Sequence, residues 1–444
     1  MMMTTVEWGN PVIRCGMYEA DITPPLGSSI PGYFYDRKST GIKDRIYSKA
    51  CVLASADGIV AIISVDAIDL SRDVVEGIRD KIYAYTQIPS SQIMISATHT
   101  HTGPPTFAST FIERNEAYLH FLIDKTADAA ICAYQRLQAA KIAFFRGREE
   151  SLSFNRRYWM KDGTLRTNPG IGNPHIDRAA GTIDPEVLAI WIDDMDGHPI
   201  GVISNFACHT DTVEGTEYSA DYPGEISAIV KKRFGEQTVS LFLMGASGDI
   251  NHIDVNGNLP IGRDHYRTMG RKLANRILES RENAEWREKA VIGSERLFFY
   301  LPSRKPSEDE VEQARQTISS GLSSDLDNAF AEELLKASAC AETGVDIEIQ
   351  VIAIGQLAVA GFPGELFAEL GCQIKRLSLF PYTLINTLCN GSATGYVFPR
   401  QAFEHGGYET RITSNSKLAV ESGEWFVRHG VELLRSVGDG IRGD

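Results

Sequence analysis

The feature that most constrains the fold is an apolar run, Ile93-Met94-Ile95, that leads into two histidines and then a Gly-Pro-Pro stop. The apolar run predicts a buried strand, and Gly103-Pro104-Pro105 ends it. Residues i and i+2 of an extended chain point to the same side, so His99 and His101 face one way where the strand ends. Loops at such ends often build functional sites, and two imidazoles suit a metal ion plus a proton-transfer group. For these two residues alone, a pair of ordinary loop histidines is an equally good interpretation.

The rest of the chain alternates strand and helix patterns without an internal repeat. This alternation predicts an α/β fold with mixed β-sheets flanked by helices. Apolar segments on either side of Asp57-Gly58 predict a hairpin, and residues 72–86 have the apolar spacing of an amphipathic helix. We expect a single large catalytic domain over residues 1–444, in which residues 303–342 form a charged, peripheral helical insertion.

Charge and composition limit the partners and the compartment. The net charge of −14 argues against nucleic acid or an anionic membrane surface as a partner. No segment approaches the roughly 20 apolar residues of a membrane span, and residues 1–15 lack the apolar core of a secretory signal. Seven scattered cysteines suit reduced thiols rather than a disulfide framework. We therefore expect a cytoplasmic protein, as a monomer or homo-oligomer, that acts on a small molecule without stable membrane association.

Polar residues recur where the predicted apolar strands stop. They are Asp66, His99, His101, His209, Asp249, Asn251 and Glu365. Each alone has an ordinary explanation; Glu365, for example, complements the dipole of the helix that it begins. Three or four nitrogen and oxygen ligands with an open position make a catalytic zinc site, and such ligands are often far apart in sequence. The set therefore predicts a metal site without establishing which residues meet in space.

An ordered series of short segments extends over nearly the whole chain. The series is Asp21-Ile22-Thr23-Pro24, Thr98-His99-Thr100-His101-Thr102-Gly103-Pro104, Asn155-Arg156, Asn205-Phe206-Ala207-Cys208-His209, Ser219-Ala220-Asp221-Tyr222-Pro223-Gly224, Gly248-Asp249-Ile250, Pro363-Gly364-Glu365, Gly395-Tyr396-Val397 and Tyr408-Glu409. With these segments the chain resembles the N-terminal catalytic domain of the neutral/alkaline non-lysosomal ceramidase family.

The resemblance implies a zinc-dependent hydrolase that cleaves an amide bond by a metal-activated water, with one zinc ion per chain. The metal ligands of the family fall on His99, His209, Glu365 and Tyr396. Mixed nitrogen and oxygen ligands of this kind also accept other divalent transition metals.

The resemblance also places catalytic residues around the ion. His101 is expected to carry a proton to the leaving group, and Tyr408 or His101 to stabilise the developing oxyanion. Arg156 is expected either to orient a polar part of the substrate or to form a structural salt bridge.

Two departures from the family bear on the substrate. The active-site serine of the family is replaced by Asn251, whose amide can donate a hydrogen bond to an oxyanion instead. The sequence is also shorter, ending at Asp444 without the C-terminal β-sandwich module of longer members. Because nothing in the sequence indicates membrane docking, we expect a ceramidase-like hydrolase of a soluble substrate other than ceramide.

Two alternatives stay open, and the sequence disfavours a third. An ester or lactone hydrolase of the same fold would use the same residues. A metal-retaining binding protein without turnover is suggested by the missing serine. A TIM-barrel amidohydrolase also carries an HxH pair, but that pair follows the first barrel strand, whereas two strands and a helix precede His99 here.

Overall fold

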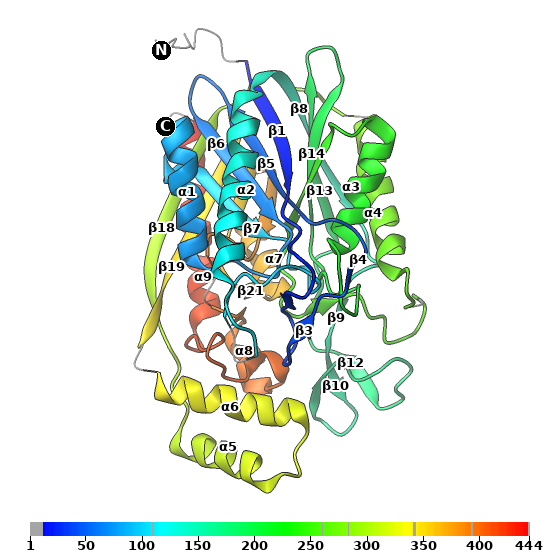
Figure 1. Cartoon of the computed structure of the whole chain (residues 1–444), viewed down its shortest axis with the longest axis vertical. Coiled ribbons are helices and arrows are strands. Elements are labelled where there is room, and N and C mark those ends of the chain that lie inside the picture. The colour runs from blue at the N-terminus through cyan, green and yellow to red at the C-terminus, as the bar shows by residue number, and fades with distance from the viewer. Residues whose placement is uncertain are drawn as a thin grey trace.

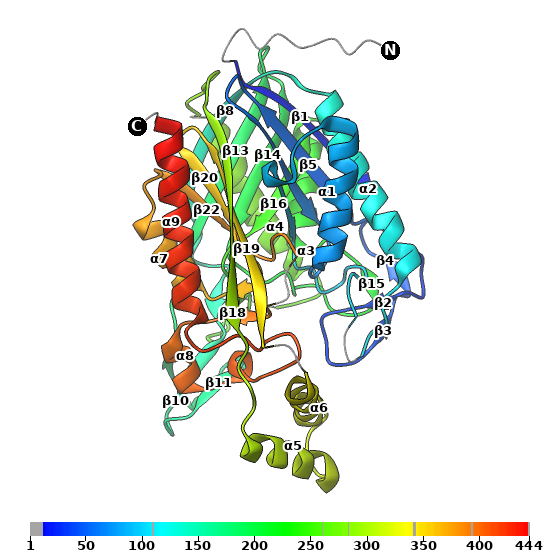
Figure 2. The same ribbon diagram turned by 90° about the vertical axis from the view of Figure 1, so that its left-hand side faces the viewer.

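The computed structural model shows four layers, in which two β-sheets pack face to face and helices cover the outer face of each (Figures 1 and 2). The structure describes residues 12–108, 111–259, 261–282, 284–340, 343–391 and 394–442. Most of residues 1–15, for which the sequence predicts no secretory signal, lies outside these residues. The mixed α/β class expected from the sequence is confirmed.

The larger sheet has the strand order β16-β14-β13-β8-β1-β5-β6-β7. These strands are β1 (Arg14–Asp21), β5 (Tyr47–Ala54), β6 (Ile59–Val65), β7 (Ile93–Ala97), β8 (Gln138–Arg148), β13 (Glu186–Asp194), β14 (Pro199–Phe206) and β16 (Val239–Met244). The hairpin expected around Asp57-Gly58 is the antiparallel pair β5–β6. β7 runs parallel to β6, and β16 runs parallel to β14. Within each of these two pairs the strands end on the same side, so the polar residues that follow the two strands start from neighbouring positions.

The smaller sheet has the order β18-β19-β20-β22 and packs on the larger one. Its strands are β18 (Ile292–Pro302), β19 (Gly344–Ile354), β20 (Leu357–Gly361) and β22 (Tyr382–Asn386). Successive side chains of β20 point to opposite faces of the sheet, so the strand contributes to two hydrophobic cores. Leu357 and Val359 pack in the core between the sheets, whereas Ala358 and Ala360 face the outer helices.

Helices cover the outer faces of both sheets. Over the larger sheet lie α1 (Arg72–Thr86), α2 (Glu116–Gln135), α3 (Asp221–Phe234) and α4 (His265–Glu282), and over the smaller one lie α7 (Ala368–Leu377) and α9 (Ser422–Arg442). Helix α1 has the bounds that its apolar spacing predicted, and its Val74, Val75 and Ile78 are buried. None of the helices in the described part of the chain is long and apolar enough to cross a membrane.

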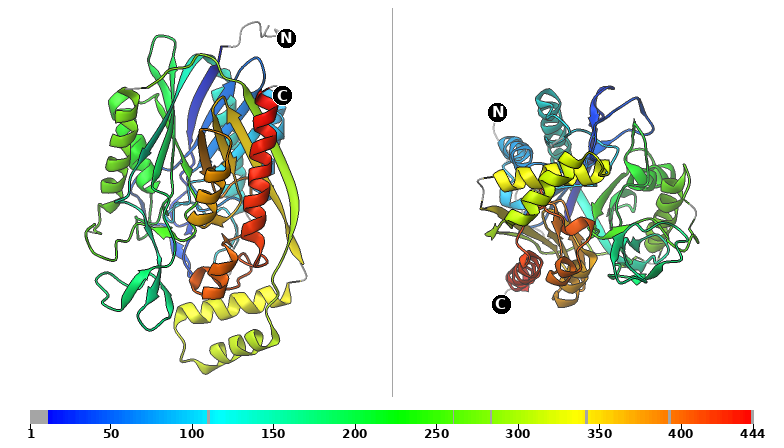
Figure 3. Two further views of the ribbon diagram at one scale, coloured as in Figure 1. Left: turned by 180° about the vertical axis from the view of Figure 1, so that it is seen from behind. Right: turned by 90° about the horizontal axis from the view of Figure 1, so that it is seen from below.

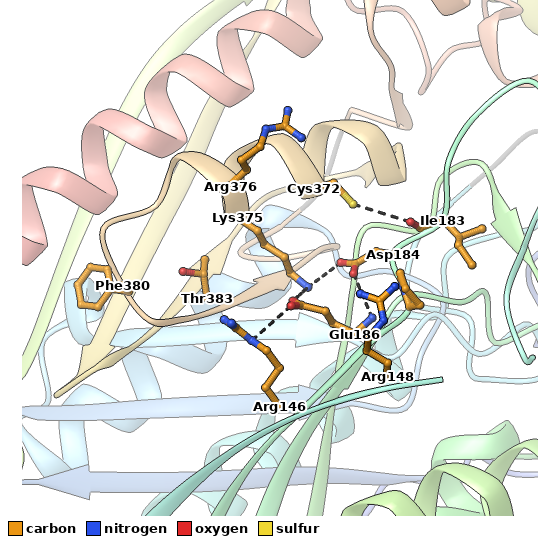
Figure 4. Close-up of a pocket in the computed structure, with 11 residues that line it drawn as sticks. Arg146, Arg148, Ile183, Asp184, Glu186, Cys372, Lys375, Arg376, Phe380 and Thr383 are labelled. Atoms are coloured by element: carbon orange, nitrogen blue, oxygen red, sulfur yellow. Dashed lines mark hydrogen bonds and ion pairs between the residues drawn. The ribbon is translucent and has the colours of Figure 1, made fainter. Parts of the chain in front are cut away.

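Helix α7 is tied to the end of the larger sheet by the ion pairs of Lys375 (Figure 4). Lys375 Nζ lies 2.6 Å from Asp184 Oδ2 and 2.9 Å from Glu186 Oε2. Arg146 Nε lies 3.3 Å from the other oxygen of Glu186. These ion pairs fix α7, the helix that begins three residues after Glu365.

Residues 303–342, expected to contain a helical insertion, include α5 (Glu308–Ser320) and α6 (Asp325–Ala339). The two helices lie together at one end of the molecule (Figures 1 and 3). Short elements complete the described chain: β2 (Ser29–Ile30), β3 (Arg37–Lys38), β4 (Gly41–Ile42), β9 (Phe154–Asn155), β10 (Arg157–Met160), β11 (Leu165–Thr167), β12 (Ile176–Ala179), β15 (Glu217–Tyr218), β17 (Ile250–Asn251), β21 (Glu365–Leu366), β23 (Tyr396–Val397), α8 (Arg400–His405), and 3-10 turns at Ser90–Gln92 and Tyr408–Thr410.

Candidate metal centre

The loops that follow β7 and β14 are joined by hydrogen bonds, which bring their histidines together. Thr210 Oγ1 donates to the carbonyl of Thr98 at 2.7 Å, and the backbone N–H of His101 donates to the carbonyl of Thr210 at 3.1 Å. The backbone N–H of Gly248 donates to Leu366 O at 2.8 Å, which holds the β21 segment beside the loop after β16. Strand ends from both sheets therefore meet at one point.

Three ligand atoms form a nearly equilateral triangle at this point. His99 Nε2 lies 3.3 Å from His209 Nε2. Glu365 Oε2 lies 3.4 Å from His99 Nε2 and 3.2 Å from His209 Nε2. Two ligands bound at about 2.0–2.1 Å to a tetrahedral zinc ion are separated by about 3.3 Å. The triangle therefore has the size of one face of a zinc tetrahedron.

The hydrogen bonds of the two imidazoles explain their orientation. Nδ1 of His99 lies 2.8 Å from Ile68 O, and Nδ1 of His209 lies 2.9 Å from Ser247 O. A carbonyl only accepts, so each Nδ1 carries a proton and each Nε2 is left to bind a proton or a metal ion. Glu365 Oε2 is buried and has no hydrogen-bond donor among the described residues. An orphaned carboxylate oxygen between two Nε2 atoms fits a cation.

The pKa shifts of His99 and Glu365 reflect the pairing of Glu365 with the two histidines. Burial alone would lower the pKa of His99, but the neighbouring Glu365 raises it above its ordinary value. Against the opposing effect of burial, His99 and His209 hold the pKa of Glu365 well below its ordinary range. Burial and Arg156 lower the pKa of His209 to about 4. A proton on Nε2 of His99 would compete with a metal ion for that atom.

Backbone geometry at the centre is unusual at two positions. His99 has φ 66°, a left-handed conformation that non-glycine residues rarely adopt and that often marks functional sites. A Cβ on Gly248 would overlap the carbonyl oxygen of Glu365. Glycine at 248 therefore permits the backbones of Gly248 and Glu365 to approach closely, which helps to place Glu365 beside the two histidines.

His101, predicted as the proton-transfer group, lies beside the triangle. Its Nε2 is 3.4 Å from His99 Nε2, and its Nδ1 is 3.7 Å from Asp211 Oδ1. Ligand nitrogens of His99, His101 and His209 all lie within 4.8 Å of one another, so His101 is also within reach of an ion. Unlike His209, it lines a pocket that opens towards solvent. Its role as acid or base rather than ligand stays a prediction.

The two predicted tyrosines stand on the same pocket wall. Tyr396 pairs with Glu365 in the parallel bridge of β21 and β23, which places it next to a triangle residue. The rings of Tyr396 and Tyr408 are 6.0 Å apart, and both residues line the pocket with His99 and Glu365. Burial raises the pKa of Tyr408 to about 12, so its hydroxyl keeps its proton at neutral pH.

Arg156 contacts His209 of the triangle, and Glu409, for which the sequence predicts no separate role, holds Arg156 in place. Its Nη1 is 3.3 Å from His209 Nε2, and its Nη2 donates to Gly248 O at 2.7 Å. Its Nε donates to Glu409 Oε1 at 2.8 Å, and Arg157 Nη1 donates to Glu409 Oε2 at 3.1 Å. Two features of the sequence could have indicated this role for Glu409. It follows Tyr408 directly, and two consecutive arginines, Arg156 and Arg157, require a negative partner if they are buried.

Asn251, predicted as an oxyanion donor, does not join this group. Its Nδ2 donates to Asn168 Oδ1 at 2.6 Å, and its Oδ1 accepts the backbone N–H of Ile253 at 3.0 Å. It is not among the residues that line the pocket. The contacts of Asn251 therefore do not favour the role that its sequence position suggested.

The pocket beside the triangle is small, and aromatic side chains form part of its wall. Its volume is about 210 Å³. Its walls include Tyr33, Phe34, Phe107, Phe111, Phe330, Tyr396 and Tyr408 together with His99, His101 and Glu365. A substrate group placed there would lie between the candidate ligands and apolar rings.

The chain is thus an α/β protein with a four-layer α/β/β/α fold and a candidate metal site, the His-His-Glu triangle, at its strand ends. The family model for neutral/alkaline non-lysosomal ceramidase, N-terminal, matches residues 13–260, which is more than half of the chain. The chain therefore belongs to the neutral/alkaline non-lysosomal ceramidase family, as its ordered motifs predicted.

Relatives extend this assignment over the chain. Neutral ceramidase A of Dictyostelium discoideum is 27% identical over 273 residues, which cover 55% of this chain and 36% of that protein. Neutral ceramidase of Pseudomonas aeruginosa is 23% identical over an alignment of 475 positions, covering 89% of this chain and 68% of that protein. The crystal structure of neutral ceramidase from P. aeruginosa has a TM-score of 0.76 at 19% identity, over 97% of this chain and 75% of that one, and thus shares the fold. The chain spans about a third of the D. discoideum protein.

Proposed function

We propose that this protein is a metal-dependent hydrolase of an amide bond and that its metal ion is zinc. The observation that carries the proposal is the triangle of His99 Nε2, His209 Nε2 and Glu365 Oε2, with edges of 3.2–3.4 Å. These residues would hold the ion, and Tyr396 is the proposed fourth ligand. Relatives named as ceramidases support amide hydrolysis, because ceramide is an N-acyl amide.

A bound zinc ion supplies Lewis acidity and lowers the pKa of a bound water to about 7. Residues of the chain then handle the protons and charges. His101, beside His99 on the pocket wall, would transfer a proton to the leaving nitrogen, and Asp211 near its Nδ1 would orient the ring. The protonated hydroxyl of Tyr408 would donate a hydrogen bond to the oxyanion.

Arg156 has a positioning role in this proposal rather than a substrate-binding one. Its guanidinium is occupied by Glu409 and Gly248 O and does not line the pocket. From there it can hold the loop that carries Gly248 and Ser247, and Ser247 O accepts a hydrogen bond from Nδ1–H of His209. Arg156 would therefore act on the centre through His209.

The substrate that we propose is a soluble small amide rather than ceramide. Drug-sized ligands occupy pockets of about 300–1,000 Å³, and a cavity of about 150 Å³ holds benzene. The pocket volume of about 210 Å³ lies between these values and suits a short acyl or aryl group. Consistent with this, we propose a small-molecule hydrolase of the cytoplasm that needs no membrane contact.

The test is hydrolysis of N-acyl amides, matched esters and ceramides, measured before and after metal removal by a chelator. We expect turnover of short amides that is lost with the metal and restored by zinc. His209→Ala should abolish both activity and zinc retention, whereas His175→Ala, at an exposed turn and in neither candidate metal group, should change neither. Turnover that persists in the metal-free protein, or no turnover of any compound by the zinc-loaded protein, would overturn the proposal.

A further inference from the structure

We infer that helix α6 sets the length of the acyl group that the site accepts, with Phe330 as the specificity-determining residue. The inference rests on the proposed function. It assigns a substrate-selecting role to a helix that the sequence presented as peripheral, and it predicts that short acyl groups are preferred because of one side chain.

Phe330 reaches from α6 into the wall of the pocket. It is only 4% exposed, although α6 lies at one end of the molecule (Figure 2). Its ring centroid is 5.0 Å from that of Phe34 and 5.4 Å from that of Tyr408, and it lines the pocket with His99 and Glu365. Phe330 therefore closes the aromatic end of the compartment that begins at the candidate ligands.

One face of α6 is fixed to the body of the protein on both sides of Phe330. Asp327 and Glu333 lie three residues before and after it, on the same helix face. Asp327 Oδ1 lies 3.2 Å from Arg411 Nη1, and Glu333 Oε2 accepts the backbone N–H of Ser414 at 3.0 Å. Arg411 Cζ also lies 3.8 Å from the centre of the Phe330 ring. These contacts hold the ring as a wall of the pocket.

The chemistry of the wall favours the acyl half of an amide. A hydrocarbon chain gains free energy by burial against Phe34, Phe107, Phe111 and Phe330, whereas the amine half leaves as a polar group that suits the open side of the pocket. An acyl group that reaches Phe330 would have to displace this fixed ring to accommodate a further methylene. Hydrophobic pockets discriminate by about 10–200-fold per methylene, so this wall can set a sharp length limit.

The direct experiment is kcat/KM for a series of amides with one amine and acyl groups of increasing length, in wild type, Phe330→Ala and Phe330→Trp. We expect Phe330→Ala to shift the preferred acyl group to longer chains, with a gain of about tenfold for long relative to short amides. Phe330→Trp should shift the preference to shorter chains. Phe298→Ala is the control, because Phe298 is 54% exposed on β18 and does not line the pocket. An equal change at every length, or the same shift in the control, would overturn the inference.

A second measurement keeps the inference separate from the proposed function. Linear carboxylates from acetate to decanoate, the products of such amides, are added to each protein, and the shift in Tm is recorded. The wild type should be stabilised most by short carboxylates and Phe330→Ala by longer ones. If the wild type hydrolyses no amide but this length dependence holds, the proposed function fails and the role of Phe330 stands. If the two proteins respond alike at every length, or to no carboxylate, the inference is wrong.

Discussion

Glu409 is the buried carboxylate that holds the arginine behind the metal centre, and Glu409→Gln removes its charge with little change in shape. Its side chain is 0% exposed and lies 2.8 Å from Arg156 Nε and 3.1 Å from Arg157 Nη1. Removing one partner of a buried ion pair costs about 3–5 kcal/mol, because the remaining charge stays buried without compensation. One carboxylate serves two guanidiniums here, so we expect a loss of about 4 kcal/mol in the free energy of unfolding.

Glu409→Gln should therefore lower Tm, and it should separately weaken zinc binding. An unfolding entropy of about 2.1 cal/mol/K per residue gives about 0.9 kcal/mol/K for 444 residues, so Tm should fall by about 4 °C. Arg156 Nη1 contacts His209 Nε2, so its displacement should also disturb the triangle. Loss of partners around metal ligands typically weakens metal binding by about 10–100-fold. Calorimetry gives the first quantity, and titration against a zinc-binding dye gives the second.

The control for Glu409→Gln is Glu150→Gln. Glu150 pairs with Arg148 at 2.8 Å, but both side chains are about two-thirds exposed, at 64% and 66%. Exposed pairs contribute about 0–1 kcal/mol, so this variant should match wild type closely. If Glu409→Gln also unfolds within about 1 kcal/mol of wild type and binds zinc equally well, the buried pairs do not support the centre as argued.

Three further substitutions test the same account. Gly248→Ala should lower Tm and zinc affinity because its Cβ overlaps the Glu365 carbonyl oxygen, whereas Gly262→Ala, with open space around its Cβ, should leave both unchanged. His101→Gln should lower kcat by about 10²–10⁴-fold with zinc content unchanged, and a loss of zinc would show that His101 is a ligand. Burial raises the folded-state pKa of Asp44 to about 6, so its contribution to stability is full below about pH 4 and is lost as the pH rises through about 6. Asp44→Asn should flatten this part of the dependence in urea unfolding between pH 4 and 7.

Local structure followed from the sequence because it depends on neighbouring residues. Asp57-Gly58 gave the hairpin turn, and residues 72–86 gave helix α1 with the predicted bounds. The apolar run before His99 gave β7, which ends at Ala97. In each case a period of two or 3.6 residues carries the information within a short window.

The assembly of the site could not be derived in this way. His99 belongs to the larger sheet and Glu365 follows the smaller one, so their contact depends on how two sheets stack. The family resemblance named both residues, but periodicity alone did not. The many charged residues of α6 predicted a peripheral helix, so the inward position of Phe330 was not predicted. The sequence position of Asn251 suggested an oxyanion donor, a role that its hydrogen bond to Asn168 does not favour.

The measurement that tests the central claim most directly is anomalous diffraction at the zinc absorption edge from crystals grown with zinc. The account predicts one strong peak inside the triangle, about 2.0–2.2 Å from His99 Nε2, His209 Nε2 and Glu365 Oε2. Among the described residues, the other group that could hold an ion is Asp194, Asp196 and His198. A peak only at that turn, or no peak within reach of the triangle, would contradict the account.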